Sequence, residues 1–142
     1  MTRDPDCVFC KIVAGKIPAS VVLESDTALA FLDVGPLAEG HLLVIPREHY
    51  ADLSAMPPEE AASMASLIPS LGRAARKVTG AEGFNVLVNE GRVAGQEVPH
   101  VHAHIIPRAV DDGLGYRWKP KQYAEGKAAE LTGRYREALT GE

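Results

Sequence analysis

The first third of the chain alternates short apolar runs with turn residues. Val21–Glu24, residues 28–33 and residues 41–46 are rich in apolar and β-branched side chains, and Gly35-Pro36 separates the second run from the third. Runs of this length between glycine and proline are typical of strands. Three such runs in succession predict an antiparallel meander.

A helical pattern covers residues 58–79. Glu59 and Glu60 follow proline in the first turn, where carboxylates favour the positive end of a helix. Gly80 suits the left-handed residue that ends a helix. Pro69 predicts a kink, because proline cannot donate a backbone hydrogen bond. The apolar face consists of positions 61, 64, 65, 68, 71, 75 and 78.

Two further strands and a second helix complete the pattern. Residues 84–89 and 100–107 are predicted strands, and a C-terminal helix is expected over about residues 126–139. This order predicts an α+β fold with a mainly antiparallel sheet of about five strands, one long helix and a C-terminal helix.

Composition narrows the class of protein. The 142 residues and 15.2 kDa suit one domain, expected over residues 1–142, that can bury a real core. The net charge of −4 provides no basic field, which argues against nucleic-acid binding as the main role. A small anionic ligand stays compatible with it, because backbone amides can hold a phosphate.

The sequence pattern predicts neither a membrane-spanning segment nor a signal peptide. No apolar run approaches the roughly 18–20 residues that span a bilayer, and the N-terminal residues lack the apolar stretch of a signal peptide. We therefore expect a cytoplasmic protein with no membrane partner. Cys7 and Cys10 form a C-x-x-C, which in a reducing compartment indicates half a metal site or a redox pair.

Three of the five histidines alternate along the last predicted strand. His100, His102 and His104 should project from one face, while Val101, Ala103 and Ile105 face the core. A polar outer strand face would use commoner residues, so this row indicates function. Two chemistries fit: neutral imidazoles bind zinc, and a free imidazole nitrogen can attack phosphorus.

The run His100-Val101-His102-Ala103-His104-Ile105-Ile106 resembles the signature of the histidine triad (HIT) superfamily. The chain also resembles the Hint-like branch of this superfamily, in its bacterial type with an N-terminal C-x-x-C. This similarity lies in residues 7–12, 30–33, 40–46 with His49, 89–91 and 94–98. The resemblance covers residues 7 to about 118, which would form the core of a single HIT domain.

The resemblance implies covalent catalysis without a cofactor for the chemical step. His102 would be the nucleophile that takes a nucleotidyl group. His104 would bind the phosphoryl group or assist the leaving group, and His41 would be a fourth active-site histidine. The substrate would be a purine nucleoside 5′-phosphoramidate, cleaved at its α-phosphate, with Phe31, Leu32 and Ile12 against the base.

The resemblance also implies a nucleotide site. Asp33 would hold the ribose hydroxyls, Asn89 would donate to the phosphate or the scissile heteroatom, and the backbone of Gln96, Glu97 and Val98 would line the α-phosphate pocket together with His104. By residue type alone, Asp33 and Asn89 could equally be turn residues. Many relatives carry Ser or Thr where this chain has Glu97, and we expect its side chain to face solvent, because an inward carboxylate would repel an anion.

Bacterial relatives suggest a structural zinc held by Cys7, Cys10, His49 and His100. Such a closed tetrahedral site leaves no open position for chemistry. The alternative is a pair of reduced thiols near the surface. A thioredoxin-type pair fits less well, since no βαβ pattern surrounds it.

Other functions stay open at this stage. A dinucleoside polyphosphate hydrolase would keep the same chemistry with another leaving group, a zinc hydrolase would bind a catalytic metal on the triad, and a nucleotide-binding scaffold would need no catalysis. The resemblance also implies a homodimer, for which residues 58–79 and 84–89 would be the contacts. The loop that holds Tyr116 and Trp118 is expected to reach a partner's active site.

Overall fold

The computed structural model describes residues 3–115 and 118–141 and groups the chain into two compact units, Met1–Asp112 and Gly113–Glu142. The first unit holds the sheet, and the second holds helix α4 (Lys127–Thr140), close to the expected range. That both units belong to one domain stays a prediction. Trp118 is exposed, whereas Tyr116 lies outside the described residues.

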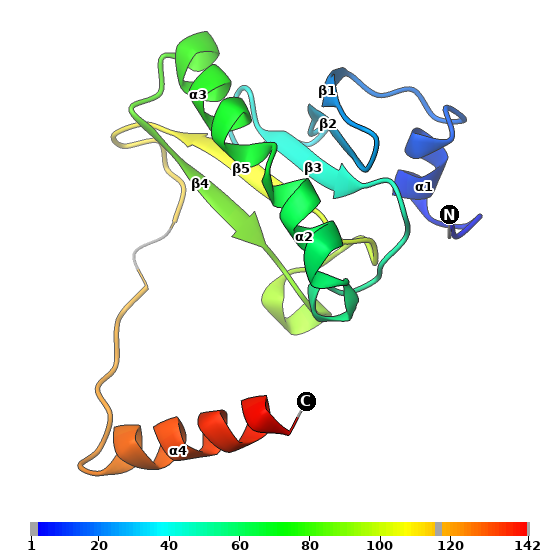
Figure 1. Ribbon diagram of the computed structural model, residues 1–142. Coiled ribbons are helices and arrows are strands. Elements are labelled where there is room, and N and C mark those ends of the chain that lie inside the picture. The colour runs from blue at the N-terminus through cyan, green and yellow to red at the C-terminus, as the bar shows by residue number, and fades with distance from the viewer. Residues whose placement is uncertain (1–2, 116–117, 142) are drawn as a thin grey trace. The chain divides into compact units, whose positions relative to one another are not determined.

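The sheet of the first unit has five strands in the order β1-β2-β3-β5-β4, and every neighbouring pair is antiparallel. The first three strands form the predicted meander, while β5 lies between β3 and β4 (Figure 1). The α+β prediction is confirmed. The strands are β1 Val21–Glu24, β2 Ala28–Leu32, β3 Leu42–Pro46, β4 Gly83–Val88 and β5 Ala103–Arg108.

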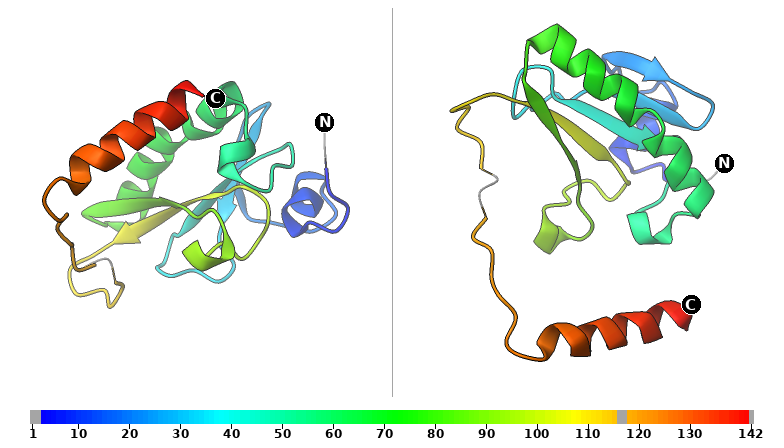
Figure 2. Two further views of the ribbon diagram at one scale, coloured as in Figure 1. Left: turned by 90° about the horizontal axis from the view of Figure 1, so that it is seen from below. Right: turned by 60° about the vertical axis from the view of Figure 1, so that its left-hand side comes forward.

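The long helical pattern folds as two helices, α2 (Pro58–Ala65) and α3 (Ile68–Thr79), which lie along one face of the sheet (Figure 2). The break falls just before Pro69, so the predicted kink is confirmed. Proline fits in the first turn of α3, where its missing N–H would have no intrahelical partner. Gly80 ends α3 with φ of 74°, as predicted.

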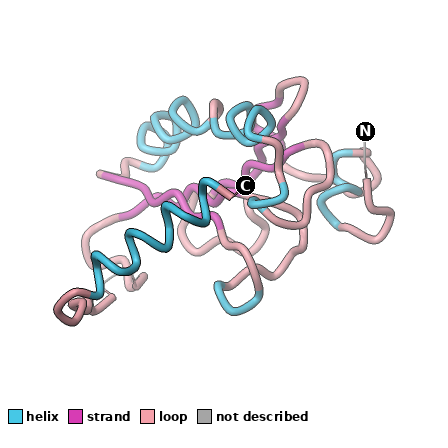
Figure 3. Tube along the Cα trace, turned by 60° about the horizontal axis from the view of Figure 1, so that its bottom comes forward, coloured by secondary structure: helices cyan, strands magenta, loops and turns pink. Residues whose placement is uncertain are grey.

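A short helix, α1 (Val8–Val13), and two 3₁₀ turns, Leu53–Ala55 and Arg92–Ala94, were not predicted from the sequence. Figure 3 colours helical segments cyan and strands magenta along the chain. Within residues 3–115 and 118–141, none of the helices combines the length and apolarity that a bilayer span needs.

The core has two layers because both faces of the central strands are covered. Ala30, Leu42 and Val44 pack in the cluster that includes residues of α2 and α3. Leu29 and Phe31 alternate with them and pack on Phe9 of α1. This explains why all five residues of β3 are buried.

The last strand is shorter than predicted. It begins at Ala103, so His100 and His102 lie in the extended segment before it. The reason is that the Val101 N–H donates to the carbonyl of Tyr50, in a loop, and so does not join the ladder. The side-chain alternation nevertheless holds: Val101, Ala103 and Ile105 belong to the helix-side core.

Candidate active site and metal centre

His102 and His104 line a pocket of about 320 Å³. Their ring centroids are 4.9 Å apart. The apolar walls come from α1, the segment that follows it, and β2. The described lining residues are Val8, Phe9, Ile12, Ile17, Pro18, Ala19, Phe31, Asp33, Val34, Leu43, Gly95, Glu97, Val98, His102 and His104.

The backbone determines which nitrogen of His102 carries the proton. Its Nδ1 lies 2.7 Å from the carbonyl oxygen of His100. A carbonyl only accepts hydrogen bonds, so Nδ1 must be the protonated nitrogen. The lone pair of the neutral ring is therefore on Nε2, which is the nitrogen available for nucleophilic attack.

His41 and His104 have the opposite arrangement. The Leu37 N–H donates to Nδ1 of His41 over 3.1 Å, so neutral His41 carries its proton on Nε2. That Nε2 lies 2.9 Å from Nδ1 of His104 and donates to it. Neutral His104 is therefore protonated on Nε2. One ring of the pocket thus offers a lone pair and its neighbour offers an N–H donor.

Burial keeps both members of this pair neutral at neutral pH. It lowers the pKa of His104 to about 4, helped by the neighbouring imidazoles and opposed by the carboxylate of Asp33. Burial also lowers the pKa of His41, which is 1% exposed, against the same opposing carboxylate. The tautomers inferred from the hydrogen bonds are therefore those of uncharged rings.

Asp33, His41 and His104 also lie close enough together to suggest a metal site. The proton positions argue against it. His41 accepts the Leu37 N–H on Nδ1, so a metal on Nε2 would require the ring to lose both protons. Asp33 instead accepts from the Gly35 N–H over 2.8 Å, which makes it a turn residue as well as a pocket residue.

The residues expected to bind the nucleotide divide into two groups. Asp33, Glu97 and Val98 line the pocket, and Glu97 is exposed. Asn89 does not line it, and its side-chain amide lies 3.4 Å from the carbonyl of Gly95, to which it donates. Gln96 is buried and its side chain also bonds to main-chain groups, so the structure does not place these two amides in the pocket.

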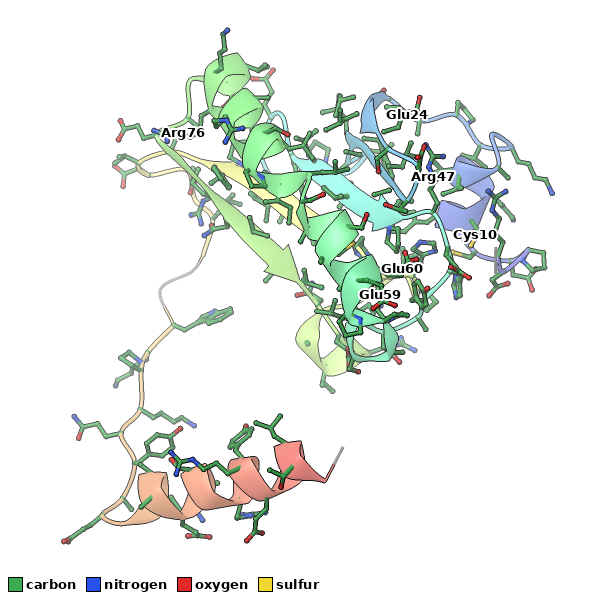
Figure 4. The ribbon with its side chains drawn as sticks, in the orientation of Figure 1. Cys10, Glu24, Arg47, Glu59, Glu60 and Arg76 are labelled. Carbon is green, nitrogen blue, oxygen red and sulfur yellow. The ribbon has the colours of Figure 1, made fainter. Side chains whose placement is uncertain are left out.

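Cys7, Cys10, His49 and His100 come together in one cluster. Nδ1 of His100 lies 3.4 Å from Sγ of Cys7 and 3.6 Å from Sγ of Cys10. Nδ1 of His49 lies 3.4 Å from Sγ of Cys10 and 3.2 Å from Nδ1 of His100. Tetrahedral zinc with ordinary bond lengths separates its sulfur and nitrogen ligands by about 3.3–3.8 Å. The donor set therefore fits zinc. Figure 4 labels Cys10 on α1.

The protonation of these groups suits a metal as well. His100 is fully buried and its Nε2 lies 2.9 Å from the Pro46 carbonyl, which leaves the lone pair on Nδ1, toward the two sulfurs. Burial lowers the pKa of His100 to about 4. Burial raises the pKa of the Cys7 thiol, so zinc binding would release a proton there.

Phe9 connects the two sites and was missed as a site residue at the sequence level. Its ring makes edge contacts with His100 and His102, at centroid distances of 5.7 Å and 5.1 Å. It also lines the pocket. Its place inside the C-x-x-C motif was the available signal, because a residue between two candidate metal ligands lies beside the cluster that they form.

Three alternating histidines that lead into the central strand β5, two of them beside an apolar pocket, are the arrangement of a histidine triad protein. A HIT domain matches residues 14–111, and the chain belongs to the HIT family. Among solved structures it is similar to a HIT family member from Bacillus subtilis (38% identity, TM-score 0.88, 93% of this chain and 96% of that one). A zinc-bound histidine triad family protein from Mycobacterium smegmatis has 38% identity and a TM-score of 0.74, over 96% of this chain and 98% of that one.

Curated relatives carry enzyme names. Adenosine 5′-monophosphoramidase hnt1 of Schizosaccharomyces pombe is 45% identical over 79% of this chain and 82% of its own length. Adenylylsulfatase HINT3 of Arabidopsis thaliana is 47% identical over 80% of this chain, and the match spans 57% of its own length. These names support the predicted Hint-like branch.

Proposed function

We propose that this protein hydrolyses purine nucleoside 5′-phosphoramidates at the α-phosphate through a nucleotidyl–histidine intermediate. The observation that carries the proposal is the complementary hydrogen bonding of two imidazoles: it places the lone pair of a neutral His102 on Nε2 and the proton of a neutral His104 on Nε2. A nucleophile beside a fixed donor is what attack on phosphorus requires. The name of the Schizosaccharomyces pombe relative supports the substrate class.

In the first step, Nε2 of His102 forms a bond to phosphorus as the P–N bond breaks, and the leaving amine takes up one proton from solvent, which the second step returns. The imidazole then carries a positive charge, which the carbonyl of His100 stabilises through Nδ1–H. In the second step, water attacks phosphorus, releases one proton and frees His102. His104 donates to the phosphoryl oxygens or assists the leaving group. His41 fixes the tautomer of His104 by donating to its Nδ1.

The pocket supports a nucleoside as the bound group. Phe9, Phe31 and Ile12 line an apolar side of the pocket against which a purine can pack, and the carboxylate of Asp33 can accept from the ribose hydroxyls. Asn89 and the backbone of Gln96, Glu97 and Val98 are proposed to complete the site for the phosphate, although the Asn89 amide must first leave Gly95.

We further propose that Cys7, Cys10, His49 and His100 bind one structural zinc. Zinc would supply a crosslink between α1 and the segment that precedes β5. Because His100 is a ligand through its ring and an acceptor through its carbonyl, this crosslink would hold the acceptor of the His102 proton. We also propose a homodimer, for which the edge strand β4 is the interface considered below.

Acid-quenched mass spectrometry tests the mechanism. Protein mixed with an adenosine 5′-phosphoramidate should gain the mass of an adenylyl group, mapped to His102. His102→Ala should lose the adduct and at least about 10³-fold in turnover, while Glu82→Gln, on an exposed turn, should match the wild type. Full turnover by His102→Ala would refute the mechanism, and so would an active wild type that never forms the adduct.

A further inference from the structure

A second hollow opens beside the histidine pocket. This groove, of about 660 Å³, is lined by Asp52, Gly91, Arg92, Gly95, Gln96, Glu97 and Pro99. Gly95 and Glu97 line both the groove and the pocket, so the two meet at these residues. A group attached to a phosphate beside His102 can therefore extend past Glu97 into the groove.

The charged side chains of the groove are Asp52, Glu97 and Arg92. Among the described residues none of the three takes part in an ion pair, and all three are exposed. Nearby Glu90 differs, because its carboxylate accepts from both the N–H and the hydroxyl of Ser54. The groove thus offers two carboxylates against one guanidinium, with the Glu97 carboxylate at its junction with the pocket.

We propose that this groove receives the leaving group and selects an amine that carries a second, positive charge remote from the scissile nitrogen. The inference rests on the proposed function, since it requires the apolar pocket to hold the purine and the phosphate to lie beside His102. An ammonium group in the groove gains attraction from Glu97 and Asp52. A leaving group with further phosphates meets repulsion at Glu97, which disfavours dinucleoside polyphosphates.

Three adenosine 5′-phosphoramidates of equal chain length test this, with the amine ending in an ammonium, a methyl or a carboxylate group. The wild type should show kcat/KM values that fall in this order, by about three- to tenfold a step at low salt, and the differences should shrink as salt screens the charges. Glu97→Gln and Asp52→Asn should each reduce the spread, which is the ratio of kcat/KM for the ammonium substrate to kcat/KM for the carboxylate substrate. Glu82→Gln, whose carboxylate lies outside the groove, should leave the spread unchanged.

Turnover of the uncharged substrate tests the proposed function separately from the charge selection. If the wild type does not turn it over, the proposed function fails. If it is turned over but the three substrates react equally, or the carboxylate substrate reacts fastest, the charge selection is refuted. The same conclusion follows if Glu97→Gln and Asp52→Asn both keep the full wild-type spread.

Discussion

At the scale of single residues, main-chain groups set the chemistry of the histidines. The carbonyls of His100 and Pro46 each receive an imidazole proton, and the N–H of Leu37 donates to His41. Each contact selects one tautomer of an uncharged ring. The site therefore obtains its nucleophilic imidazole from a carbonyl, and its donating imidazole through His41, whose own tautomer the Leu37 N–H sets.

The low pKa of His104 predicts a loss of stability in acid. In the unfolded chain this histidine gains its proton near pH 6.5, and in the folded protein near pH 4. Between these values the unfolded state binds more protons, so the free energy of unfolding falls as the pH drops from about 6.5 to 4. We expect His104→Gln to show a smaller fall, by about 1–3 kcal/mol for this partly exposed ring.

Urea unfolding at pH 7 and pH 4.5, with wild type and variant compared at each pH, isolates this contribution from those of His41 and His100. The variant changes one titrating ring and leaves the others in place. An equal fall in both proteins would show that folded His104 titrates as it does in the unfolded chain, and would contradict the neutral tautomer assigned to it.

Residue identity was the part of the site that the sequence could predict. The alternation of His100, His102 and His104 is visible in the sequence, and the three side chains do share one face. Their proton positions were not predictable, since the acceptor for His102 is a carbonyl and the donor to His41 is an amide. Every residue has a carbonyl and every residue but proline has an N–H, so no residue type signals these contacts.

At the scale of elements, the loops around the pocket are joined by Gln96. Its side-chain oxygen accepts from the Gly91 N–H over 2.9 Å, and its amide donates to the carbonyls of Ala51 at 2.8 Å and Val98 at 3.1 Å. The side chain thereby joins the loop that holds Ala51 to the β4–β5 loop, which holds Gly91 and Val98. The sequence suggested Gln96 only as a backbone contributor to the phosphate site.

Gln96→Leu should destabilise the protein by about 2–4 kcal/mol, because it leaves the Gly91 N–H and the Ala51 carbonyl without their partner at roughly 1–3 kcal/mol each. Chemical denaturation measures this directly. The neighbouring Glu97→Gln is the matched control and should stay within about 0.5 kcal/mol of the wild type, since Glu97 is exposed. A Gln96→Leu variant as stable as this control would show that Gln96 does not join the loops.

Helix α1 shows where sequence patterns stop being sufficient. The boundaries of β1, β2, β3 and β4 were predicted to within one residue, because apolar alternation and turn residues mark them. The six residues of α1 have too few turns for a helical period. In the structure their position follows from burial of Phe9 and Cys10 and from the cysteine–histidine cluster.

Metal removal should therefore act chiefly on this end of the molecule. We expect the purified protein to contain one zinc per chain and to lose about 10 °C or more of melting temperature after treatment with a strong chelator, because binding to the folded state alone stabilises it. His49→Gln, which removes one ligand, should contain less zinc and respond less to the chelator. Wild-type protein with no zinc and an unchanged melting temperature would contradict the assignment.

At the scale of the whole molecule, the two edges of the sheet differ in how they are protected. Edge strand β1 has four residues, a break in register between Val21 and Leu23, and Glu24, which pairs with Arg47 at 2.8 Å (Figure 4). Strand β4 has six residues in continuous register with β5 and carries no charge. A long, regular, uncharged edge is a template for pairing with another strand.

A homodimer joined through β4 would remove this exposed edge. Val86, in the middle of the strand, is 43% exposed and would become buried. Val86→Lys should shift the protein toward monomers, because two-fold pairing of β4 brings the two lysines close to each other and like charges on neighbouring strands repel. Val22→Lys is the matched control, since Val22 is 51% exposed on the protected edge, and it should leave the association unchanged.

Sedimentation equilibrium over a concentration series distinguishes these outcomes, starting from the chain mass of 15.2 kDa. The dimer is wrong if the wild type sediments as a monomer throughout. The β4 interface is wrong if the wild type is dimeric and Val86→Lys associates as strongly as Val22→Lys, because the contact must then lie elsewhere. Selective dissociation of Val86→Lys would instead identify β4 as the strand by which two sheets become one.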